Sequence, residues 1–443
     1  MDSRWRPFYG WWVLLSAAAV LMIGFALSAY ALPVFYPELI NAFHWPRANV
    51  ALGGSLKTLL VGLLAPLNGW IIDRRGPKTI LLAGVAALGI SLAFLSGIHS
   101  LWQYYVLCVF LGLGGSWTHH FPIHLLIANW FAKRRGLVIG FLTAVAGVGN
   151  SLIPIWSATL IKRDGWREAL LILPLILIVP FLAVAFLVRN RPEEKGLHAD
   201  GGLESAPAII HPHRAGGSGA ASGLGWTALK TGAFWVLAGV FLLPAWAQLS
   251  VWQHLVLFLR DEGFKPTVAA YFLSLFLLAS SVGRFFGGPL SDRISADYAT
   301  LIGVVLIGFS VVALLSSRSL AAIYLGVIVL GLGEGSTVTC RPLLVFGHYG
   351  ASGVGKLYGV ATAMMTVGAF VGPVLAGYIH DQTHSYHLAF LLALALVCIS
   401  IVLVVLLKRT EFPTQNEERK GILRFRGSGI WVGDLKAMRR IRH

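Results

Sequence analysis

Apolar and polar positions follow one another in long blocks along this chain. Apolar segments of about 20 residues, separated by short polar turns, are long enough to cross the roughly 30 Å hydrocarbon core of a membrane as α-helices. We count twelve such segments, at residues 9–34, 48–71, 78–98, 102–129, 136–161, 168–189, 232–259, 267–290, 299–316, 320–345, 357–379 and 386–407. The pattern therefore predicts an all-α membrane protein with twelve transmembrane helices, because a membrane β-barrel would show short alternating segments instead.

The second half of this pattern repeats the first half. Residues 69–74 recur as 288–293, and residues 111–114 recur as 330–333, with an offset of 219 residues. The same offset relates Gly140, Gly149 and Pro154 to Gly359, Gly368 and Pro373. A repeat at one fixed offset indicates an internal duplication. In an apolar chain, two such halves predict a transporter whose site lies between them near the middle of the membrane.

The one long polar interruption falls where the duplication requires a joint. Residues 190–230 are polar and end in an Ala/Gly/Ser-rich stretch that is typical of a flexible linker. We therefore expect an N-terminal six-helix half at 1–189, a cytoplasmic linker at 190–230, a C-terminal six-helix half at 231–408 and a basic cytoplasmic tail at 409–443.

Composition and charge add the orientation. Hydrophobic residues make up 56% of the 443 residues and charged residues only 12%, about half the share of a soluble protein. Most of the 35 Lys and Arg residues lie in the two termini and in alternate loops, so the positive-inside rule places both termini in the cytoplasm. The net charge of +16 is spread over the loops of one membrane face, which argues against nucleic-acid binding. The basic tail could bind anionic lipid or be solvated.

Several motifs resemble one known family. Residues 69–78 read Gly-x-x-x-Asp-Arg-Arg-Gly-Pro-Lys and, with the weaker copy at 288–293, are similar to the signature loop of the major facilitator superfamily. Residues 9–11, 130–136, 165–167 and 191–197 and the pair Gly283-Arg284 resemble the bacterial monocarboxylate and oxalate/formate transporters of that superfamily. The resemblance covers residues 8–408. It implies the major facilitator fold, transport by alternating access, and a bacterial inner (plasma) membrane.

The signature loops carry candidate gating residues. These are Asp73, Arg74, Asp292 and Arg293. A carboxylate at a helix end can accept hydrogen bonds from a neighbouring helix N-terminus and pair with arginine, and such a contact could hold an inner gate shut. The alternative is that these residues only cap their helices and fix the topology.

Ionisable residues within the spans point to the substrate. Three cations, Lys57, Arg284 and Arg341, stand against one anion, Glu334. Such residues are costly in a membrane and are candidates for function. Because an uncompensated buried cation is unfavourable, the positive excess predicts an anion-binding cavity. Arg284 is the first candidate, since its planar fork fits a carboxylate and matches the family's arginine in this span. It could instead be a structural partner of Glu334, and Arg341 could reach only the membrane interface.

Further polar residues complete the predicted site. Lys57, Tyr30, Asn150 and Ser280 are candidates for contact with the substrate, although Lys57 could equally face the helix bundle. Glu334, His120 and His124 are candidates for proton coupling, with a counter-ion role for Glu334 and packing for the histidines as alternatives. His254 is expected near the outer end of its span. Animal-type monocarboxylate carriers have an acid where this chain has Ser280 and a lysine where it has Tyr30.

These observations predict a secondary active transporter that moves a small organic anion, with a monocarboxylate favoured, by alternating access and proton symport. An exporter or antiporter of another small amphiphilic metabolite or drug is the alternative within transport. A membrane sensor acting through the basic tail is the alternative outside it. We expect no enzyme activity, because no nucleophile–base pair, nucleotide loop or metal cluster stands out. We expect no cofactor and no bound metal, and a monomer with protons and membrane lipid as its other partners.

Overall fold

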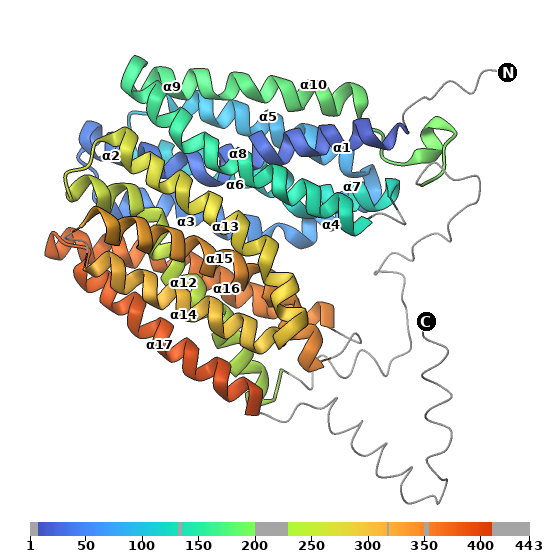
Figure 1. The fold of residues 1–443 in the computed structure, drawn as a ribbon. Helices are drawn as coiled ribbons and strands as arrows, with labels where there is room; N and C mark the ends of the chain where they lie inside the picture. Colours follow the sequence, from blue (N-terminus) through green and yellow to red (C-terminus); the bar gives the residue numbers. More distant parts are fainter. Residues whose placement is uncertain (1–7, 132–134, 200–228, 317–318, 350–353, 410–443) are drawn as a thin grey trace, which may run out of the picture.

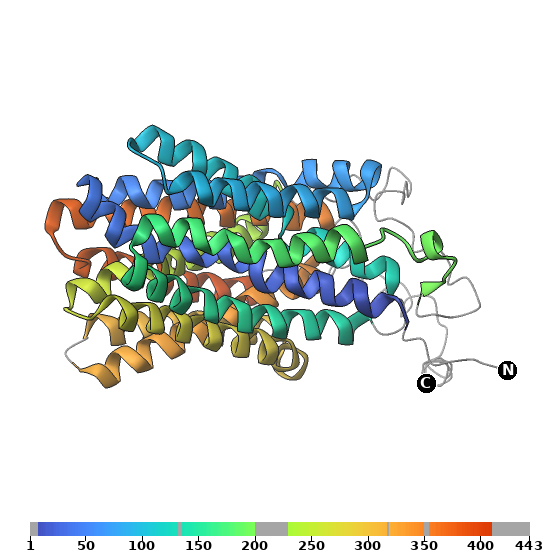
Figure 2. The ribbon, with the colours of Figure 1, turned by 90° about the horizontal axis from the view of Figure 1, so that it is seen from above.

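The computed structural model describes residues 8–131, 135–199, 229–316, 319–349 and 354–409. Figure 1 and Figure 2 show helices that run along one common direction, with the N-terminal half beside the C-terminal half. The Ala/Gly/Ser-rich part of the predicted linker and the predicted basic tail from residue 410 lie outside the described residues.

The N-terminal half contains helical segments at all six predicted positions. The first span is α1 (Gly10–Ala19), η1 (Val20–Phe25), η2 (Leu27–Ala31) and α2 (Leu32–Phe43), and the second is α3 (Arg47–Leu63) with α4 (Ala65–Arg75). The third to fifth are α5 (Pro77–Leu95), α6 (Leu101–Trp117) with α7 (His120–Trp130), and α8 (Arg135–Asp164). The sixth is α9 (Trp166–Ile172), η3 (Leu173–Leu177) and α10 (Ile178–Leu187).

The C-terminal half is more regular. After the short η4 (Pro192–Lys195), its six spans are unbroken helices. They are α12 (Gly232–Asp261), α13 (Pro266–Ile294), α14 (Ala296–Leu315), α15 (Leu320–Tyr349), α16 (Val354–Thr383) and α17 (His387–Arg409).

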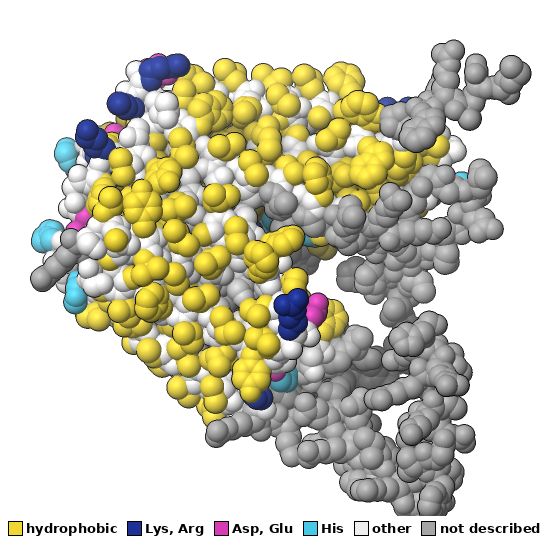
Figure 3. All heavy atoms as spheres, viewed as in Figure 1, with side chains coloured by type: hydrophobic (Ala, Val, Ile, Leu, Met, Phe, Trp, Pro, Cys, Tyr) yellow, Lys and Arg dark blue, Asp and Glu magenta, His cyan; other side chains and the backbone are white. Residues whose placement is uncertain are grey.

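Length and hydropathy confirm an all-helical membrane protein. Within the described ranges, nine helices are long and apolar enough to cross a membrane, or ten if α3 and α4, bent by 55°, form one span. Segments α6–α7 and α8 occupy the two remaining predicted positions. Figure 3 shows hydrophobic side chains over the broad flank of the bundle and charged side chains mainly at its ends. That distribution suits a surface covered by lipid.

Breaks within the N-terminal spans were not expected from the hydrophobic pattern. The second span bends after Leu63, where α4 begins with a proline in its first turn. The fourth span is interrupted at Thr118 and His119, and His119 has an extended backbone. The first span contains π-helical turns. Discontinuous helices at this depth are tolerated where protein or a cavity surrounds them, so these breaks indicate proximity to a functional region.

The duplication is visible as repeated close contacts between helices. A Cβ atom on Gly114 of α6 would lie 2.9 Å from the carbonyl oxygen of Gly84 in α5. A Cβ on Gly333 of α15 would lie 2.7 Å from the carbonyl oxygen of Gly303 in α14. Both residues of the second pair stand 219 positions after those of the first. In each half, a glycine at the corresponding position therefore allows two neighbouring helices to pack closely.

The halves contact one another mainly through two pairs of helices, with a smaller contact between α2 and α12. Helix α3 packs against α16, and α8 packs against α13. The first described turn of α1 and the last turn of α17 lie at the same end of the bundle (Figure 1). The interface therefore runs through the centre of the molecule, where the duplication predicts the site.

We expect Gly114→Val and Gly333→Val each to lower the melting temperature of the detergent-solubilised protein by several degrees. The added side chain has no room, and overpacking of this kind costs about 1–3 kcal/mol. Gly347→Val is the matched control, because it lies on α15 and a Cβ there would meet nothing within 4 Å. Equal melting temperatures for the three variants would contradict the close-contact interpretation.

Candidate functional site

A cavity of about 150 Å³ lies between the two halves. The N-terminal half contributes Tyr30 of η2 and Thr58 of α3 to its lining. The larger share comes from the C-terminal half and includes Gln248, Trp252, Phe276, Glu334, Arg341 and Met365. The cavity therefore combines an apolar and partly aromatic wall with one carboxylate and one guanidinium group. That composition suits a small ligand with a charged group and an apolar body.

Arg284 and Glu334 form an ion pair at this cavity. Nη2 of Arg284 lies 3.3 Å from Oε1 and 3.4 Å from Oε2 of Glu334. The Ser280 hydroxyl donates a hydrogen bond to Oε2 of the same carboxylate. The two charged side chains are only 16% and 11% exposed, and the Tyr30 hydroxyl lies close enough to Arg284 to interact with it. The structure thus brings Arg284, Glu334, Ser280 and Tyr30 of the predicted site together.

Arg341 lies on the same helix as Glu334 but, unlike Arg284, forms no ion pair with it. Its Nη2 atom is buried and has no hydrogen-bond partner within the described parts of the chain. The Nε atom of Arg284 is likewise buried without a partner there. Around the cavity, two guanidinium groups therefore stand against the single carboxylate of Glu334. The predicted positive excess is present even without a contribution from Lys57.

Lys57 lies away from the cavity lining. Its ammonium group donates hydrogen bonds to the carbonyl oxygens of Ser28 at 2.5 Å and Ala29 at 3.2 Å. Both acceptors belong to the π-helical segment η2. Backbone carbonyls thus stabilise this buried cation inside the N-terminal half, and the adjacent residue Thr58 is the one that lines the cavity.

The histidines of the fourth span lie beside the Arg284 region. His119 lies in the helix break and His120 begins α7. The ring of Phe25 lies 5.2 Å from that of His119 and 5.0 Å from that of His120, centroid to centroid. Both imidazoles are close enough to Arg284 to interact electrostatically. The centroids of His120 and His124 are 5.6 Å apart. None of these rings lines the cavity described above.

Asn150 lies in α8, outside that lining. The residue is 2% exposed, and its Oδ1 atom has no hydrogen-bond partner among the residues that the structure describes. Because Asn150 does not line the cavity in this structure, its contact with the substrate stays a prediction.

The four candidate gating residues are exposed. Asp73, Arg74, Asp292 and Arg293 lie at the ends of α4 and α13. Arg74 stacks over the ring of Trp70, 4.1 Å from its centroid. The described residues show no ion pair or hydrogen bond from either aspartate to a neighbouring helix. The gating contact therefore remains a prediction for another conformation.

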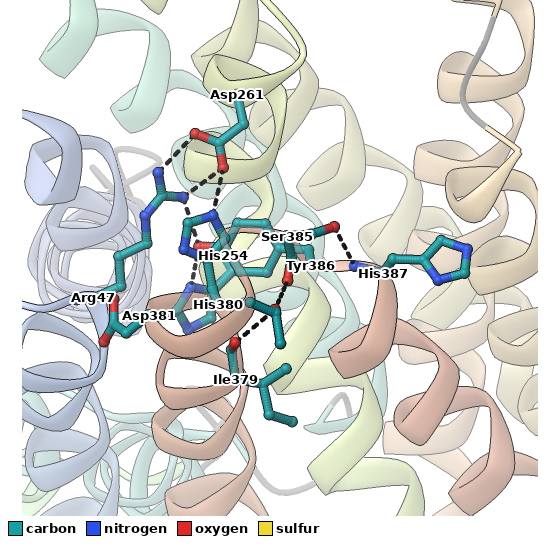
Figure 4. A network of polar contacts seen from close by, with 10 residues as sticks. Arg47, His254, Asp261, Ile379, His380, Asp381, Ser385, Tyr386 and His387 are labelled. Atoms are coloured by element: carbon teal, nitrogen blue, oxygen red, sulfur yellow. Dashed lines mark hydrogen bonds and ion pairs between the residues drawn. The ribbon is translucent and has the colours of Figure 1, made fainter.

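A second polar cluster lies at the end of the bundle opposite the candidate gating residues, where α3 begins and α12 ends. Figure 4 shows its contacts. We call it the Arg47 cluster, and it comprises Arg47, His254, Asp261, His380, Asp381 and Tyr386. The Arg47 guanidinium donates two hydrogen bonds to Asp261, at 2.6 and 2.7 Å. The Asp381 carboxylate accepts hydrogen bonds from the backbone N–H groups of Arg47 and Ala48, both at 2.9 Å. It therefore caps the N-terminus of α3 from the other half of the molecule.

The remaining members of the Arg47 cluster lie around the Arg47–Asp261 ion pair. His254 is fully buried, and its two ring nitrogens lie 2.9 Å from the Tyr386 hydroxyl and 2.8 Å from the carbonyl oxygen of Pro373. Nε2 of His380 lies 3.2 Å from Asp261. No motif or spacing in the sequence connects residues so far apart, although the hydrophobic pattern placed His254 near this end. The cluster joins α3 of one half to α12 and α16 of the other.

Comparison with known proteins agrees with this arrangement. The family model described as "Major Facilitator Superfamily" matches residues 14–295 and 255–440 of the chain. Monocarboxylate transporter 13 of Bos taurus is 28% identical over 411 residues, covering 88% of this chain and 87% of that protein. The probable sulfoacetate transporter SauU of Cupriavidus necator is 25% identical over 376 residues, covering 81% and 84%. These relatives are transporters and not enzymes.

Solved structures show the same fold. A bacterial homologue of the human lysosomal transporter Spinster, in an inward-facing and unoccupied conformation, superposes with a TM-score of 0.72 at 16% identity, covering 90% of this chain and 97% of that one. The nucleoside transporter NupG superposes with a TM-score of 0.71 at 12% identity, covering 89% and 99%. The duplicated helical halves, the cavity between them and the match over most of the chain lead to one conclusion: the chain belongs to the major facilitator superfamily.

Proposed function

We propose that this protein is a secondary active transporter that carries a small organic anion, a monocarboxylate in the first instance, across the membrane by alternating access with proton symport. One observation carries the proposal. Arg341 and Glu334 line the cavity between the halves, and Arg284 pairs with Glu334, so two guanidinium groups stand against one carboxylate. A bound monoanion would balance that charge, which is otherwise costly to bury in a membrane.

The size and lining of the cavity support the substrate class. Its volume of about 150 Å³ is well below the roughly 300–1,000 Å³ of pockets for drug-sized ligands. Trp252, Phe276 and Met365 offer apolar surface to a short carbon chain. The positive excess favours an anion over a neutral amphiphile or drug. The names of the relatives, a monocarboxylate transporter and a sulfoacetate transporter, point to the same class of substrate.

The two ends of the molecule support alternating access. At one end the Arg47 cluster holds α3 against α12 and α16. At the other end Asp73 and Asp292 are exposed. With both termini in the cytoplasm, as the loop charges predict, the Arg47 cluster is the closed outer gate of a transporter that the resemblance assigns to a bacterial inner membrane. The aspartates and their arginines, Arg74 and Arg293, would then form the inner gate once the halves rock together.

Glu334 is the proposed site of proton coupling. Its carboxylate receives hydrogen bonds from both Arg284 and Ser280. Protonation would cancel its charge, weaken the pair with Arg284 and free that guanidinium for a substrate carboxylate. Proton and anion would then favour each other's binding, which is the requirement for symport. His120 and His124 are the second candidates, because His120 lies within electrostatic range of Arg284 and its ring is next to that of His124.

We expect purified protein in proteoliposomes to take up radiolabelled lactate or pyruvate when an inward proton gradient is imposed. Arg284→Ala should reduce that uptake at least tenfold, because it removes the cavity's charge excess and leaves Glu334 unpaired. Arg163→Ala is the matched control, since Arg163 is 70% exposed and pairs with the neighbouring Asp164. Absence of uptake for lactate, pyruvate, formate, oxalate and sulfoacetate would overturn the proposed function.

Glu334→Gln separates coupling from transport. Glutamine keeps the shape and hydrogen-bonding capacity of the side chain but cannot exchange a proton. We expect this variant to exchange labelled for unlabelled anion at a rate within about threefold of the wild type and to lose accumulation driven by the proton gradient. Gradient-driven accumulation that persists in the variant would exclude Glu334 as the coupling residue and turn attention to His120 and His124.

Arg47→Ala tests the closed end. Loss of the pair with Asp261 should favour opening on that side, and a partly exposed ion pair of about 1 kcal/mol corresponds to roughly a fivefold change in population. The measurement is the rate at which a membrane-impermeant maleimide, added outside, labels Ala369→Cys in a background without the native cysteines. Ala369 lines the cavity. Rates equal to those of the Arg163→Ala control would show that the pair does not hold this end closed.

A further inference from the structure

The two arginines near the cavity differ in what they have left to offer a ligand. Arg284 is held by Glu334, with both carboxylate oxygens within 3.4 Å of its Nη2 atom. Tyr30 lies beside it as well. Arg341 lines the cavity directly, and its buried Nη2 atom has no partner within the described residues. A buried guanidinium donor without an acceptor is unfavourable, so this atom marks a place where an anion would be stabilised.

Among the described residues, Glu334 is the carboxylate within electrostatic range of Arg341, and it makes no hydrogen bond to Arg341. Glu334 is the carboxylate on the cavity wall, and its oxygens already accept hydrogen bonds from Ser280 and Arg284. Glu334 and Arg341 are seven residues apart on α15, two helical turns, and therefore share one face of that helix. The free donor of Arg341 thus lies on the cavity wall, within electrostatic range of the Arg284–Glu334 pair but not hydrogen-bonded to it.

The rest of the wall suggests how a small anion would lie. Trp252 and Phe276 stack at 6.1 Å between centroids and offer a flat apolar surface. Gln248 is 2% exposed, lines the cavity, and has an Oε1 atom without a partner in the described structure. A ligand with its anionic group on Arg341 could place its carbon chain against the aromatic wall and a hydroxyl or keto group near the Gln248 amide.

We propose that Arg341, rather than Arg284, makes the first contact with the anionic group of the substrate in this conformation, and that Gln248 contacts its polar substituent. This inference rests on the proposed function, since it names the binding residues of the same cavity. Arg284 is then a positioning and coupling residue, which becomes available to the anion when the charge of Glu334 is cancelled. A fork such as that of Arg341 binds a carboxylate or a sulfonate through two donors, which lysine cannot reproduce.

A charge-balanced pair of variants separates the two arginines. Arg341→Gln removes the proposed contact and the positive excess together. The double variant Arg284→Gln/Glu334→Gln removes one cation and one anion, so the cavity keeps the single positive charge of Arg341. Binding is measured on purified protein in detergent at pH 8 with radiolabelled lactate, and with the neutral isostere lactamide as competitor. Melting temperatures check that each variant is folded.

We expect Arg341→Gln to weaken lactate binding by about 10–100-fold, the size expected for charge-assisted hydrogen bonds. The double variant should lose gradient-driven uptake but weaken lactate binding at least tenfold less than Arg341→Gln does. Gln248→Leu should weaken lactate but not propionate, which lacks the hydroxyl group. Lactamide should not compete with lactate.

Two results would overturn the inference. The first is wild-type affinity in a folded Arg341→Gln variant, and the second is loss of binding in the double variant while Arg341→Gln still binds. If Arg341→Gln does not fold, Arg341→Lys is the test, and an affinity unchanged from the wild type would exclude a contact through the fork. A wild type that binds neither lactate nor pyruvate, formate, oxalate or sulfoacetate would instead refute the proposed function itself.

Discussion

The arrangement of charged side chains at the centre of this molecule depends on the free-energy cost of burying a charge away from water. The three buried cations meet that cost in different ways. Arg284 pairs with Glu334, and Lys57 is stabilised by two carbonyl oxygens of a π-helical segment. Arg341 has a buried donor for which the described residues supply no acceptor, and it faces the cavity. The proposed anion site follows from this imbalance, because a ligand can supply the missing negative charge while the protein keeps the cavity open to it.

The two halves share a framework and differ where chemistry is expected. The Gly114 and Gly333 contacts repeat at the same offset. At that offset Gly115 corresponds to Glu334, and Lys57 corresponds to Phe276. The C-terminal half therefore carries the carboxylate and the aromatic wall of the cavity. The N-terminal half carries the breaks in its second and fourth spans instead. The duplicated positions thus account for the shared helix packing. The positions that differ between the halves, such as Gly115 and Glu334, account for the proposed site.

The contacts between the halves are unequal at the two ends. The Arg47 cluster ties α3 to α12 and α16 through an ion pair and a cap on the α3 N-terminus. The signature-loop residue Asp73 and its copy Asp292 are exposed at the other end. Hydrogen bonds of this kind can be broken and remade on different partners without repacking the hydrophobic interior of either half. A rocking motion about the central cavity is therefore compatible with the structure, and the proposed function uses it.

The helical membrane fold, the duplication and the positive excess within the spans could all be predicted from the sequence, because hydrophobic length, fixed-offset repeats and charge counts are properties of the chain alone. The sequence also named Arg284, Glu334, Ser280 and Tyr30 without showing that they meet. The pairing of Glu334 with Arg284, the hydrogen bonds of Lys57 to backbone carbonyls and the contact of Arg47 with Asp261 depend on the three-dimensional packing of the helices. Those partners come from spans far apart in the chain, and the rotation and bending of each helix decide which side chains meet. Hydrophobic periodicity does not determine either, because a membrane span can present apolar residues to lipid as well as to neighbouring helices.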